Sequence, residues 1–394
     1  MRRAVALLAL ACCTHHETST QEAWDPYAGP PAYPDTRPKI ALPAGDFGLV
    51  PASGSDRMSV VDLGGGSVIA DVPIGRSAFV LDGPHQAVAD MKRRVAYVVY
   101  AYPEALASAG NHSHGSSQRS GWVQALALDD LRAVGEVEVD PNPGEIAVSD
   151  DGKRLVVTHY DLAAAAAMDR PIEDRRSTLA LIDPDAMQTF GTPTPDKLLV
   201  CVAPHGLTLA RPDGAKAFVA CYGEDAIAIV DLVDTHAPVV LVPAGQGSQP
   251  YGVALSPDGA RVAIGTRGSH DVRFLDVASA TLEALIVPAL GEVYVPAWTP
   301  DGTGVYVPTQ SLDAVTLVDA KTGAMKVRTV FDAATCAAPI EVALGTDSTV
   351  VYVVCEGTAT APGAVVTLDA ATLATKARVE VGFFPGRPFV GRGP

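Results

Sequence analysis

The chain has 394 residues, of which 48% are hydrophobic and 19% are charged, and its formal net charge is −16. The hydrophobic content suffices for a large core, while the negative charge opposes binding to nucleic acid or to an anionic lipid surface. Aromatic residues make up only 6% of the chain, so few stacking platforms exist for single-stranded nucleic acid.

The N-terminus has the pattern of an export signal. Arg2 and Arg3 are followed by an apolar run at residues 4–11 that is too short to span a bilayer. Small residues before Cys12 resemble a bacterial lipoprotein signal, in which cleavage precedes a cysteine that is then lipidated. The leucine usually found three residues before that cysteine has this relation to Cys13 instead. We expect residues 1–12 to be a lipoprotein-type signal with Cys12 lipidated; an ordinary secretory signal is the alternative.

Residues 13–45 form a polar, proline-rich segment without a hydrophobic period. Such segments stay extended and bury no core, so we expect a tether between the anchor and a domain at residues 46–394. The expected location is the bacterial cell envelope, with the lipid-anchored protein facing the periplasm or the cell surface. A freely secreted protein is the alternative, and the lipid is the only membrane contact that we expect.

One phrase recurs after the tether: an alternating apolar strand closed by aspartate. The seven closing residues are Asp62, Asp129, Asp183, Asp231, Asp276, Asp319 and Asp369. An aspartate in this place accepts hydrogen bonds from backbone N–H groups two residues on and closes a hairpin. The shorter spacings between these aspartates are typical of one four-stranded propeller blade.

A second phrase precedes the first in most units and is clearest at residues 249–266, QPYGVALSPDGARVAIGT. Asp-Gly between two apolar runs is a strong hairpin signal. Each unit therefore supplies strands A, B, C and D. The sequence predicts an all-β fold, a seven-bladed β-propeller of four-stranded antiparallel blades.

SPDG at residues 256–259, TPDG at residues 299–302 and pairs such as Tyr306-Val307 and Tyr352-Val353 make the chain similar to YVTN-type β-propeller repeats. The resemblance extends from about Asp46 to the C-terminus. It implies a propeller of bacterial or archaeal surface proteins and implies no single activity, because WD-repeat and lactonase-type propellers share parts of the pattern.

The first unit lacks a clear strand A. Residues 387–391 could supply it and close the ring, which would remove an exposed sheet edge. Residues 40–42 are the competing segment.

Irregular features gather at one end of the predicted propeller, which we call the upper end, where the D–A and B–C connections lie. Insertions at residues 101–121 and 160–177 decorate it, and the alanine run in the second suggests a short helix. Long loops on a rigid scaffold often bind ligands. We expect a ligand site at this end, formed by His85, His205, Tyr251, Tyr294 and His159.

The pair His112 and His114 in the first insertion could bind zinc or copper, since imidazoles are common ligands of these ions. A solvated loop is the alternative that we favour, so we assign no cofactor beyond this candidate ion. The sequence contains no haem-attachment, HExxH, GxSxG, Walker A or EF-hand motif.

The remaining cysteines are expected to pair as Cys201–Cys221 and Cys336–Cys355. In both pairs one cysteine lies three residues before a proline that begins a strand A, and the other ends a strand B. The D–A connection meets the end of B at the upper end, which places each pair within disulfide reach. An exported chain meets an oxidising compartment, where such bonds persist.

The sequence thus favours a monomeric, non-enzymatic binding or scaffold propeller for an unidentified protein or small molecule, with no catalytic residue assigned. A lactonase-like or metal-dependent enzyme is the first alternative, in which Glu145 and Glu341 would join His85 and His205 at the channel mouth. A copper-binding redox accessory is the second.

Overall fold

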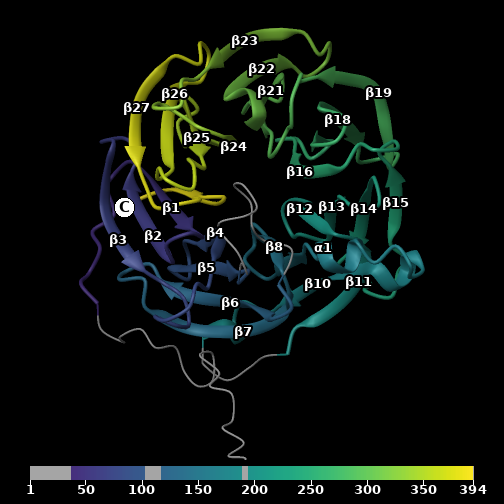
Figure 1. Cartoon of the computed structure of the whole chain (residues 1–394), viewed down its shortest axis with the longest axis horizontal. Helices are drawn as coiled ribbons and strands as arrows, with labels where there is room; N and C mark the ends of the chain where they lie inside the picture. Colours follow the sequence, from purple (N-terminus) through teal and green to yellow (C-terminus); the bar gives the residue numbers. More distant parts are fainter. Residues whose placement is uncertain (1–36, 103–116, 189–193, 394) are drawn as a thin grey trace, which may run out of the picture.

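A computed structural model of the chain describes residues 37–102, 117–188 and 194–393. Within these ranges, four-stranded antiparallel sheets form a ring of seven blades around a central channel (Figure 1). The predicted seven-bladed propeller is confirmed. No helix in the described ranges has the length and apolar character needed to cross a bilayer.

The first three blades are given from the innermost strand outward. Blade 1 comprises β28 (Phe389–Arg392), β1 (Asp46–Ala52), β2 (Arg57–Asp62) and β3 (Ser67–Pro73). Blade 2 comprises β4 (Pro84–Asp90), β5 (Val95–Tyr100), β6 (Ser120–Ala127) and β7 (Ala133–Pro141). Blade 3 comprises β8 (Pro143–Val148), β9 (Leu155–His159), β10 (Arg176–Ile182) and β11 (Asp196–Val202).

The other four blades follow in chain order. Blade 4 comprises β12 (Pro204–Leu209), β13 (Lys216–Cys221), β14 (Ala226–Asp231) and β15 (Val240–Pro243). Blade 5 comprises β16 (Pro250–Leu255), β17 (Arg261–Thr266), β18 (Asp271–Asp276) and β19 (Thr281–Pro288). Blade 6 comprises β20 (Ala297–Trp298), β21 (Gly304–Thr309), β22 (Ala314–Asp319) and β23 (Met325–Val330). Blade 7 comprises β24 (Pro339–Leu344), β25 (Val350–Cys355), β26 (Ala364–Asp369) and β27 (Thr375–Glu380).

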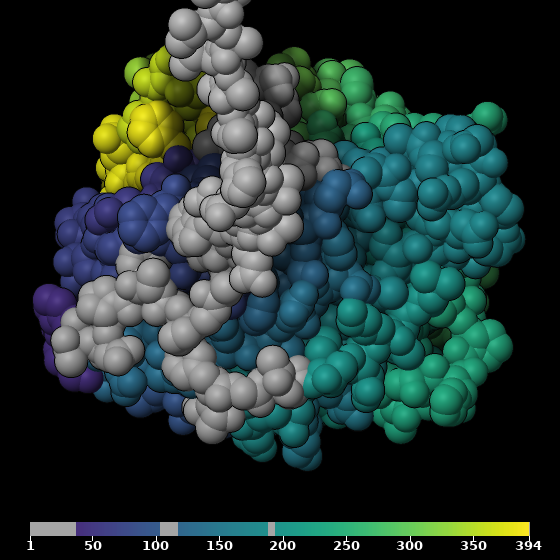
Figure 2. Space-filling view, turned by 60° about the horizontal axis from the view of Figure 1, so that its bottom comes forward, coloured from purple at the N-terminus to yellow at the C-terminus, as the bar shows by residue number. Residues whose placement is uncertain are grey.

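The ring is closed by the C-terminal strand. β28 pairs antiparallel with β1, with Arg392 opposite Asp46 and Phe389 opposite Leu49. The N-terminal and C-terminal surfaces accordingly adjoin in Figure 2. The competing segment lies elsewhere: the Ile40 backbone N–H donates to the Asp129 carbonyl in blade 2. Closure by β28 covers the edge of β1 that would otherwise be open to the channel.

The recurring aspartates close the C–D hairpins as predicted. Six of the seven accept a hydrogen bond from a backbone N–H two or three residues on: Asp62, Asp183, Asp231, Asp276, Asp319 and Asp369. The exception is Asp129, whose carboxylate binds Arg94. There the adjacent Asp130 accepts from the Arg132 N–H instead.

The hydrophobic core lies between neighbouring blades. Val99 and Val123 of blade 2, for example, belong to the same buried cluster as Leu155 and Val157 of blade 3. Fully burying each such side chain contributes about 1.5–3 kcal/mol, so every blade is stabilised mainly by its two neighbours.

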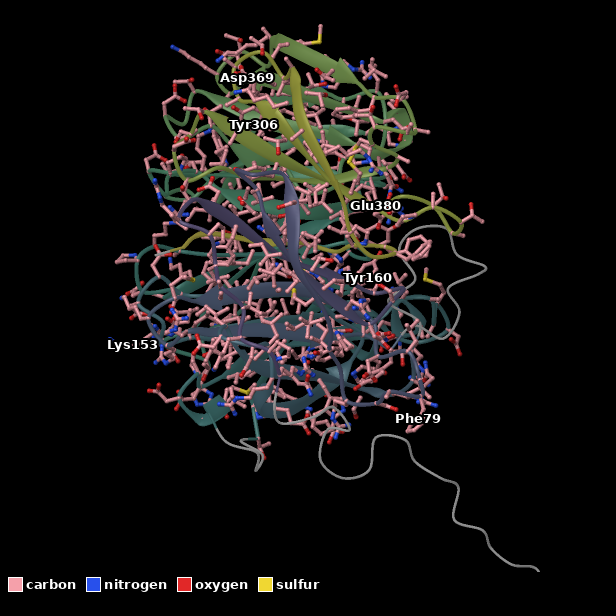
Figure 3. The ribbon with its side chains drawn as sticks, turned by 90° about the vertical axis from the view of Figure 1, so that its left-hand side faces the viewer. Phe79, Lys153, Tyr160, Tyr306, Asp369 and Glu380 are labelled. Carbon is pink, nitrogen blue, oxygen red and sulfur yellow. A yellow bond between two sulfur atoms is a disulfide. The ribbon has the colours of Figure 1, made fainter. Side chains whose placement is uncertain are left out.

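The two ends of the ring differ in their connections. Lys153 of an A–B turn and Asp369 of a C–D turn lie toward the lower end, while Phe79, Tyr160 and Glu380 lie toward the upper end (Figure 3). The insertion after β9 carries helix α1 (Leu162–Ala165) and a 3-10 helix (Ile172–Arg175) at the upper end. The alanine run therefore forms the short helix expected of it. Two further 3-10 helices span Ala186–Gln188 and Gln310–Leu312.

Both predicted disulfides are present. Cys201 of β11 is bonded to Cys221 of β13, with 5.8 Å between the Cα atoms, and thus joins blade 3 to blade 4. Cys336, in the connection from β23 to β24, is bonded to Cys355 of β25 with a Cα separation of 5.2 Å. All four cysteines are buried, which supports a structural role at the upper end.

Candidate functional site

Six inner strands enter the channel through the same local step. A proline begins five of them, at Pro84, Pro143, Pro204, Pro250 and Pro339, and Pro385 stands four residues before β28. The preceding residue has a positive φ in every case: Gly83, Asn142, Ala203, Gln249, Ala338 and Phe384. Because the backbone step repeats, the first residue after each proline lies at one level of the channel and the second lies one level deeper.

The first level holds most of the ligand residues expected from the sequence. We call His85, His205, Tyr251 and Tyr294 the upper ring. The His205 and Tyr251 rings are stacked with centroids 3.7 Å apart, and Tyr294 lies 4.9 Å from Tyr251. His85 lies 6.0 Å from His205. The structure therefore brings four of the five predicted residues together.

The upper ring is packed. The residues His85, His205, Tyr251 and Tyr294 keep only 7%, 2%, 1% and 2% of their surface exposed. Tyr160, from the second insertion, packs edge-on against His205 at 4.8 Å. Arg267 lies over the faces of Tyr294 and Tyr251, at 4.7 and 5.1 Å from their centroids. Such cation–π contacts stabilise the cluster.

The fifth predicted residue lies apart from the ring. His159 ends β9, and its Nδ1 atom lies 2.9 Å from the Thr178 carbonyl oxygen and 3.0 Å from the Thr178 hydroxyl. That hydroxyl donates to Asp140. Burial lowers the pKa of His159 to about 4, so its imidazole is neutral at physiological pH. His112 and His114 lie outside the described residues, as does Cys12.

The second level holds a buried ion cluster. Arg387 Nη1 donates to Glu145 Oε2 at 2.8 Å, and Arg387 Nε lies 2.7 Å from Glu341 Oε1. The two glutamate side chains are 3% and 5% exposed, whereas Arg387 keeps 30% of its side chain accessible. This triad, which we call the channel triad, joins blade 3, blade 7 and the closing segment.

Neighbouring groups hold the triad in place. Glu145 Oε2 also accepts from the Leu207 backbone N–H at 2.8 Å. His205 Nδ1 of the upper ring lies 3.9 Å from Glu145 Oε1. Gln86, at the equivalent position of blade 2, accepts from the Ile146 N–H through Oε1 at 2.6 Å. The triad is thus positioned from three sides by fixed groups.

The two carboxyl groups have perturbed acidity. Burial raises the pKa of Glu341 to about 8, against the lowering effect of Arg387, and the nearby Glu145 raises it further. Burial also raises the pKa of Glu145, while Arg387 and the Leu207 N–H oppose that rise. With the two carboxyls sharing one guanidinium, Glu341 is largely protonated at pH 7, and the additional donor at Glu145 favours its ionised form against the effect of burial.

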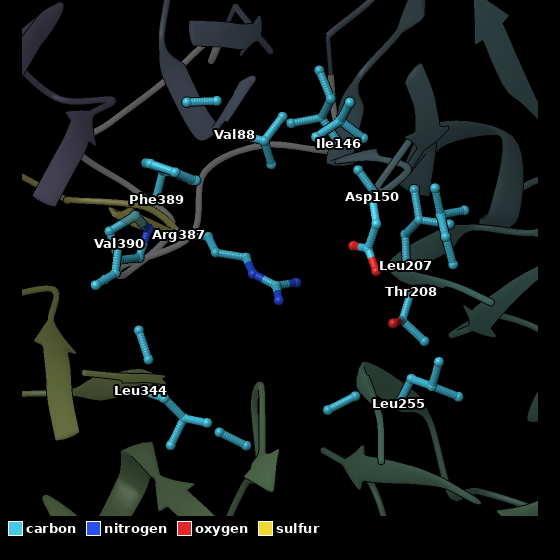
Figure 4. Close-up of a pocket in the computed structure, with 18 of the residues that line it drawn as sticks. Val88, Ile146, Asp150, Leu207, Thr208, Leu255, Leu344, Arg387, Phe389 and Val390 are labelled. Carbon is cyan, nitrogen blue, oxygen red and sulfur yellow. The ribbon is translucent and has the colours of Figure 1, made fainter. Parts of the chain in front are cut away.

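A cavity of about 860 Å³ lies below the triad. Gln86, Glu341 and Arg387 line its inner end, and the Arg387 guanidinium reaches into its centre (Figure 4). The lining continues down to exposed turn residues, among them Lys92, Asp150, Pro257 and Pro300. These turns are of the A–B type, so the cavity opens at the lower end of the propeller.

Glycine stands at the same register position in blades 4 and 5. A Cβ on Gly206 would lie 2.3 Å from the Tyr251 carbonyl oxygen, and one on Gly252 would lie 2.5 Å from the Tyr294 carbonyl oxygen. Adjacent inner strands approach too closely there for any side chain. Blades 4 and 5 therefore contribute backbone only at the second level, and the charged groups come from blades 3 and 7 and the closing segment.

Sequence reasoning missed Arg387 as a site residue, although it placed Glu145 and Glu341 near His205. The missed signal is the aligned tripeptide Pro-x-polar, which reads PHQ at residues 84–86, PGE at 143–145, PIE at 339–341 and PGR at 385–387. The glutamates lie in the channel interior and not on a solvated rim. Within the described ranges, no group of three or more His, Cys, Asp or Glu side chains is arranged to hold a metal ion.

No protein-family model matches the sequence, and none of the curated proteins matches it. Solved structures do resemble it. The Pseudomonas aeruginosa periplasmic gluconolactonase aligns with a TM-score of 0.65 and 18% identity over 89% of this chain and 100% of that one. A Bacteroides uniformis protein, named as a candidate 6-phosphogluconolactonase, aligns with a TM-score of 0.63 and 15% identity over 88% and 100%.

A protein of unknown function from Desulfotomaculum acetoxidans is similar to the same degree, with a TM-score of 0.63 and 12% identity over 88% of this chain and 99% of that one. At these identities the likeness demonstrates the propeller fold alone. The chain shares its architecture with lactonases and with proteins of no assigned activity.

Proposed function

We propose that this protein is an exported binding propeller whose ligand, a small molecule, enters the lower cavity and contacts Arg387 and Glu341. The observation that carries the proposal is the placement of the channel triad at the closed end of an open cavity. Buried charges cost several kcal/mol of desolvation each. Perturbed ionisable groups at the end of a concave pocket are the usual mark of a binding site.

The upper-end site expected from the sequence is the less favoured location. The upper-ring side chains are packed against one another, so their direct role is to close the channel above the triad. His205 also lies against Glu145 and helps to position it. Replacing His85, His205 and Tyr251 together would still test whether a partner binds at the upper end.

Hydrolysis of a lactone is the second candidate function. Two buried carboxyls that share one guanidinium and differ in their other donors could serve as general acid and general base, the pair that ester hydrolysis uses. The gluconolactonase likeness adds a substrate class to try, although that activity belongs to the relative. Release of a hydroxy acid from gluconolactone, followed by pH-stat titration, tests this candidate directly.

We further propose that the chain is held at the cell envelope through a lipid on Cys12. The two disulfides support an oxidising compartment. Mass spectrometry of the membrane-extracted N-terminal peptide tests the anchor. An unmodified N-terminus that starts downstream of Cys13 would remove the lipid and leave export in place.

Blocking the cavity tests the binding function. Thr208 points into the cavity from blade 4 (Figure 4), so Thr208→Trp should fill it and abolish ligand-induced thermal stabilisation. Phe79→Ala, at the upper end and 79% exposed in the parent residue, is the control and should leave the stabilisation unchanged. Stabilisation that survives Thr208→Trp but is lost when the upper ring is replaced would move the site to the upper end.

A further inference from the structure

The channel triad has one positive charge too few for its two carboxylates. Arg387 bridges Glu145 and Glu341, and it is the cation that both glutamates contact. His205 is a further titratable group beside the triad, with its Nδ1 atom 3.9 Å from Glu145 Oε1. When both carboxylates are ionised, the guanidinium compensates only one of them.

We propose that the cavity's ligand is an aliphatic primary amine, whose ammonium group binds beside Glu341 and supplies the missing positive charge. This inference rests on the proposed binding function and names its ligand class. An ammonium group is a compact cation with three donors and requires no planar, bidentate partner.

Glu341 is placed to receive such a group. The side chain lines the inner end of the cavity, and its ion pair with Arg387 is made through Oε1. The carboxyl group has a second oxygen, Oε2, which this ion pair does not use. A carboxylate oxygen is a strong acceptor for a charged donor, because charge-assisted bonds are about twice as strong as neutral ones.

The apolar walls of the cavity favour a ligand with an aliphatic chain. Between the triad and the rim the cavity is lined by apolar residues that include Val88, Leu344 and Phe389 (Figure 4). A carbon chain that extends from the ammonium group toward the lower opening would bury against them, at about 0.8 kcal/mol per methylene. A bare metal ion gains nothing from these walls.

The net charge of the whole chain also favours a cationic ligand. A net charge of −16 attracts cations and repels anions as they approach the mouth of the cavity. A carboxylate or phosphate ligand would also have to share Arg387 with two glutamates already bound to it. The electrostatics therefore favour an amine over an anion both at a distance and at the site.

Binding should be coupled to the release of a proton. Burial and the neighbouring Glu145 keep the pKa of Glu341 at about 8, so the free protein holds a proton there at pH 7. An alkylammonium ion stays charged, as a lysine side chain does with a pKa of about 10.4. It pairs with the ionised carboxylate and displaces the proton. With one coupled proton, the Kd should rise about 25-fold between pH 8.5 and pH 6.5.

Titration calorimetry with three matched probes tests the inference: hexylamine, hexanol and hexanoate. Hexylamine should bind about tenfold more tightly than hexanol at pH 8.5, and hexanoate should bind most weakly. In buffers of different ionisation enthalpy at pH 7, hexylamine should release close to one proton and hexanol none.

Two Glu→Gln variants separate the site from a general charge effect. Glu341→Gln should lose both the preference for the amine and the proton release, and should still bind hexanol. Glu380→Gln removes a carboxylate of 61% exposure at the upper end and should change neither. His205→Asn should retain the proton release, because the released proton comes from Glu341.

Each other outcome contradicts a particular claim. Equal binding of hexylamine and hexanol without proton release would overturn the amine and leave the binding cavity standing. Competition by potassium chloride as effective as that by hexylamine would reassign the site to an inorganic cation and overturn the inference. If no probe binds and Thr208→Trp changes nothing in a wider ligand screen, the binding function itself fails.

Discussion

The upper and lower halves of the channel are built from consecutive positions of one repeated step, yet one is packed and the other is open. The residue directly after the strand-opening proline is His85, His205 or Tyr251 in three blades, and these rings meet across the channel. The next residue is glycine in blades 4 and 5 and is charged at Glu145, Glu341 and Arg387.

This difference shows that a propeller channel is filled or left open by the size and charge of single residues on an unchanged backbone. Large aromatic rings exclude water and pack against one another. At the next level the charged side chains form ion pairs with one another, and the glycines have no side chain to fill the channel. This level therefore stays open. The following experiments change residues of the packed or of the open half of the channel and test whether the two halves differ as described.

Deletion of residues 384–394 removes both Arg387 and strand β28, so it should abolish the fold as well as the site. Blade 1 would lose its inner strand and expose an unpaired edge in the channel. We expect aggregation or unfolding, measured by size-exclusion chromatography and thermal melting. A truncated chain that stays monomeric with an unchanged Tm would show that closure is dispensable.

Arg387→Met keeps the closing strand and removes only the cation. Two buried carboxyl groups would remain without a cation, a loss worth about 3–5 kcal/mol at pH 8. The loss should be smaller at pH 5, where both carboxyls can take up protons. Chemical denaturation at the two pH values measures it. The triple variant with Glu145→Gln and Glu341→Gln should regain much of the stability, and a penalty that is independent of pH would argue against ionic coupling.

The disulfides strengthen the packed end. Replacing Cys201 and Cys221 by alanine should cost about 3 kcal/mol, because the bond closes a loop of about twenty residues. The same change at Cys336 and Cys355 should cost about as much. Denaturation of both double variants tests this. Ligand binding in the lower cavity should survive in each, and its loss would mean that the two ends are coupled.

Glu341→Gln should have its smallest effect on stability at low pH, and the effect should grow as the pH rises. The folded-state pKa of Glu341 is raised from 4.5 to about 8, so the folded protein binds this proton more tightly than the unfolded chain does. Stability is therefore lost as the pH rises from 4.5 through 8. Glutamine cannot titrate, so the stability of the variant relative to the parent should rise by about 4 kcal/mol between pH 5 and pH 9. Parallel stability curves would contradict the assignment.

The sequence by itself was enough for the fold and for the local chemistry of the hairpins. Asp231, Asp319 and their equivalents cap turns within three residues, and each cysteine pair is separated by only 20 or 19 positions, across one D–A connection. These contacts join residues close in the chain, so the repeat pattern places both partners at once. For the closing strand the sequence offered two segments, residues 387–391 and residues 40–42. Only the pairing of β28 with β1 decided between them.

Only the tertiary structure decided where the site lies. Arg387 and Glu145 are 242 positions apart, and they meet because closure of the ring brings the C-terminal segment back beside the first blades. Solvent exposure also depended on contacts between blades. The histidines and tyrosines expected to face a ligand are buried by rings from other blades. Hydrophobic periodicity and turn motifs report on neighbours within a blade. Which side chains fill the channel depends on all the blades together, and no single repeat carries that information.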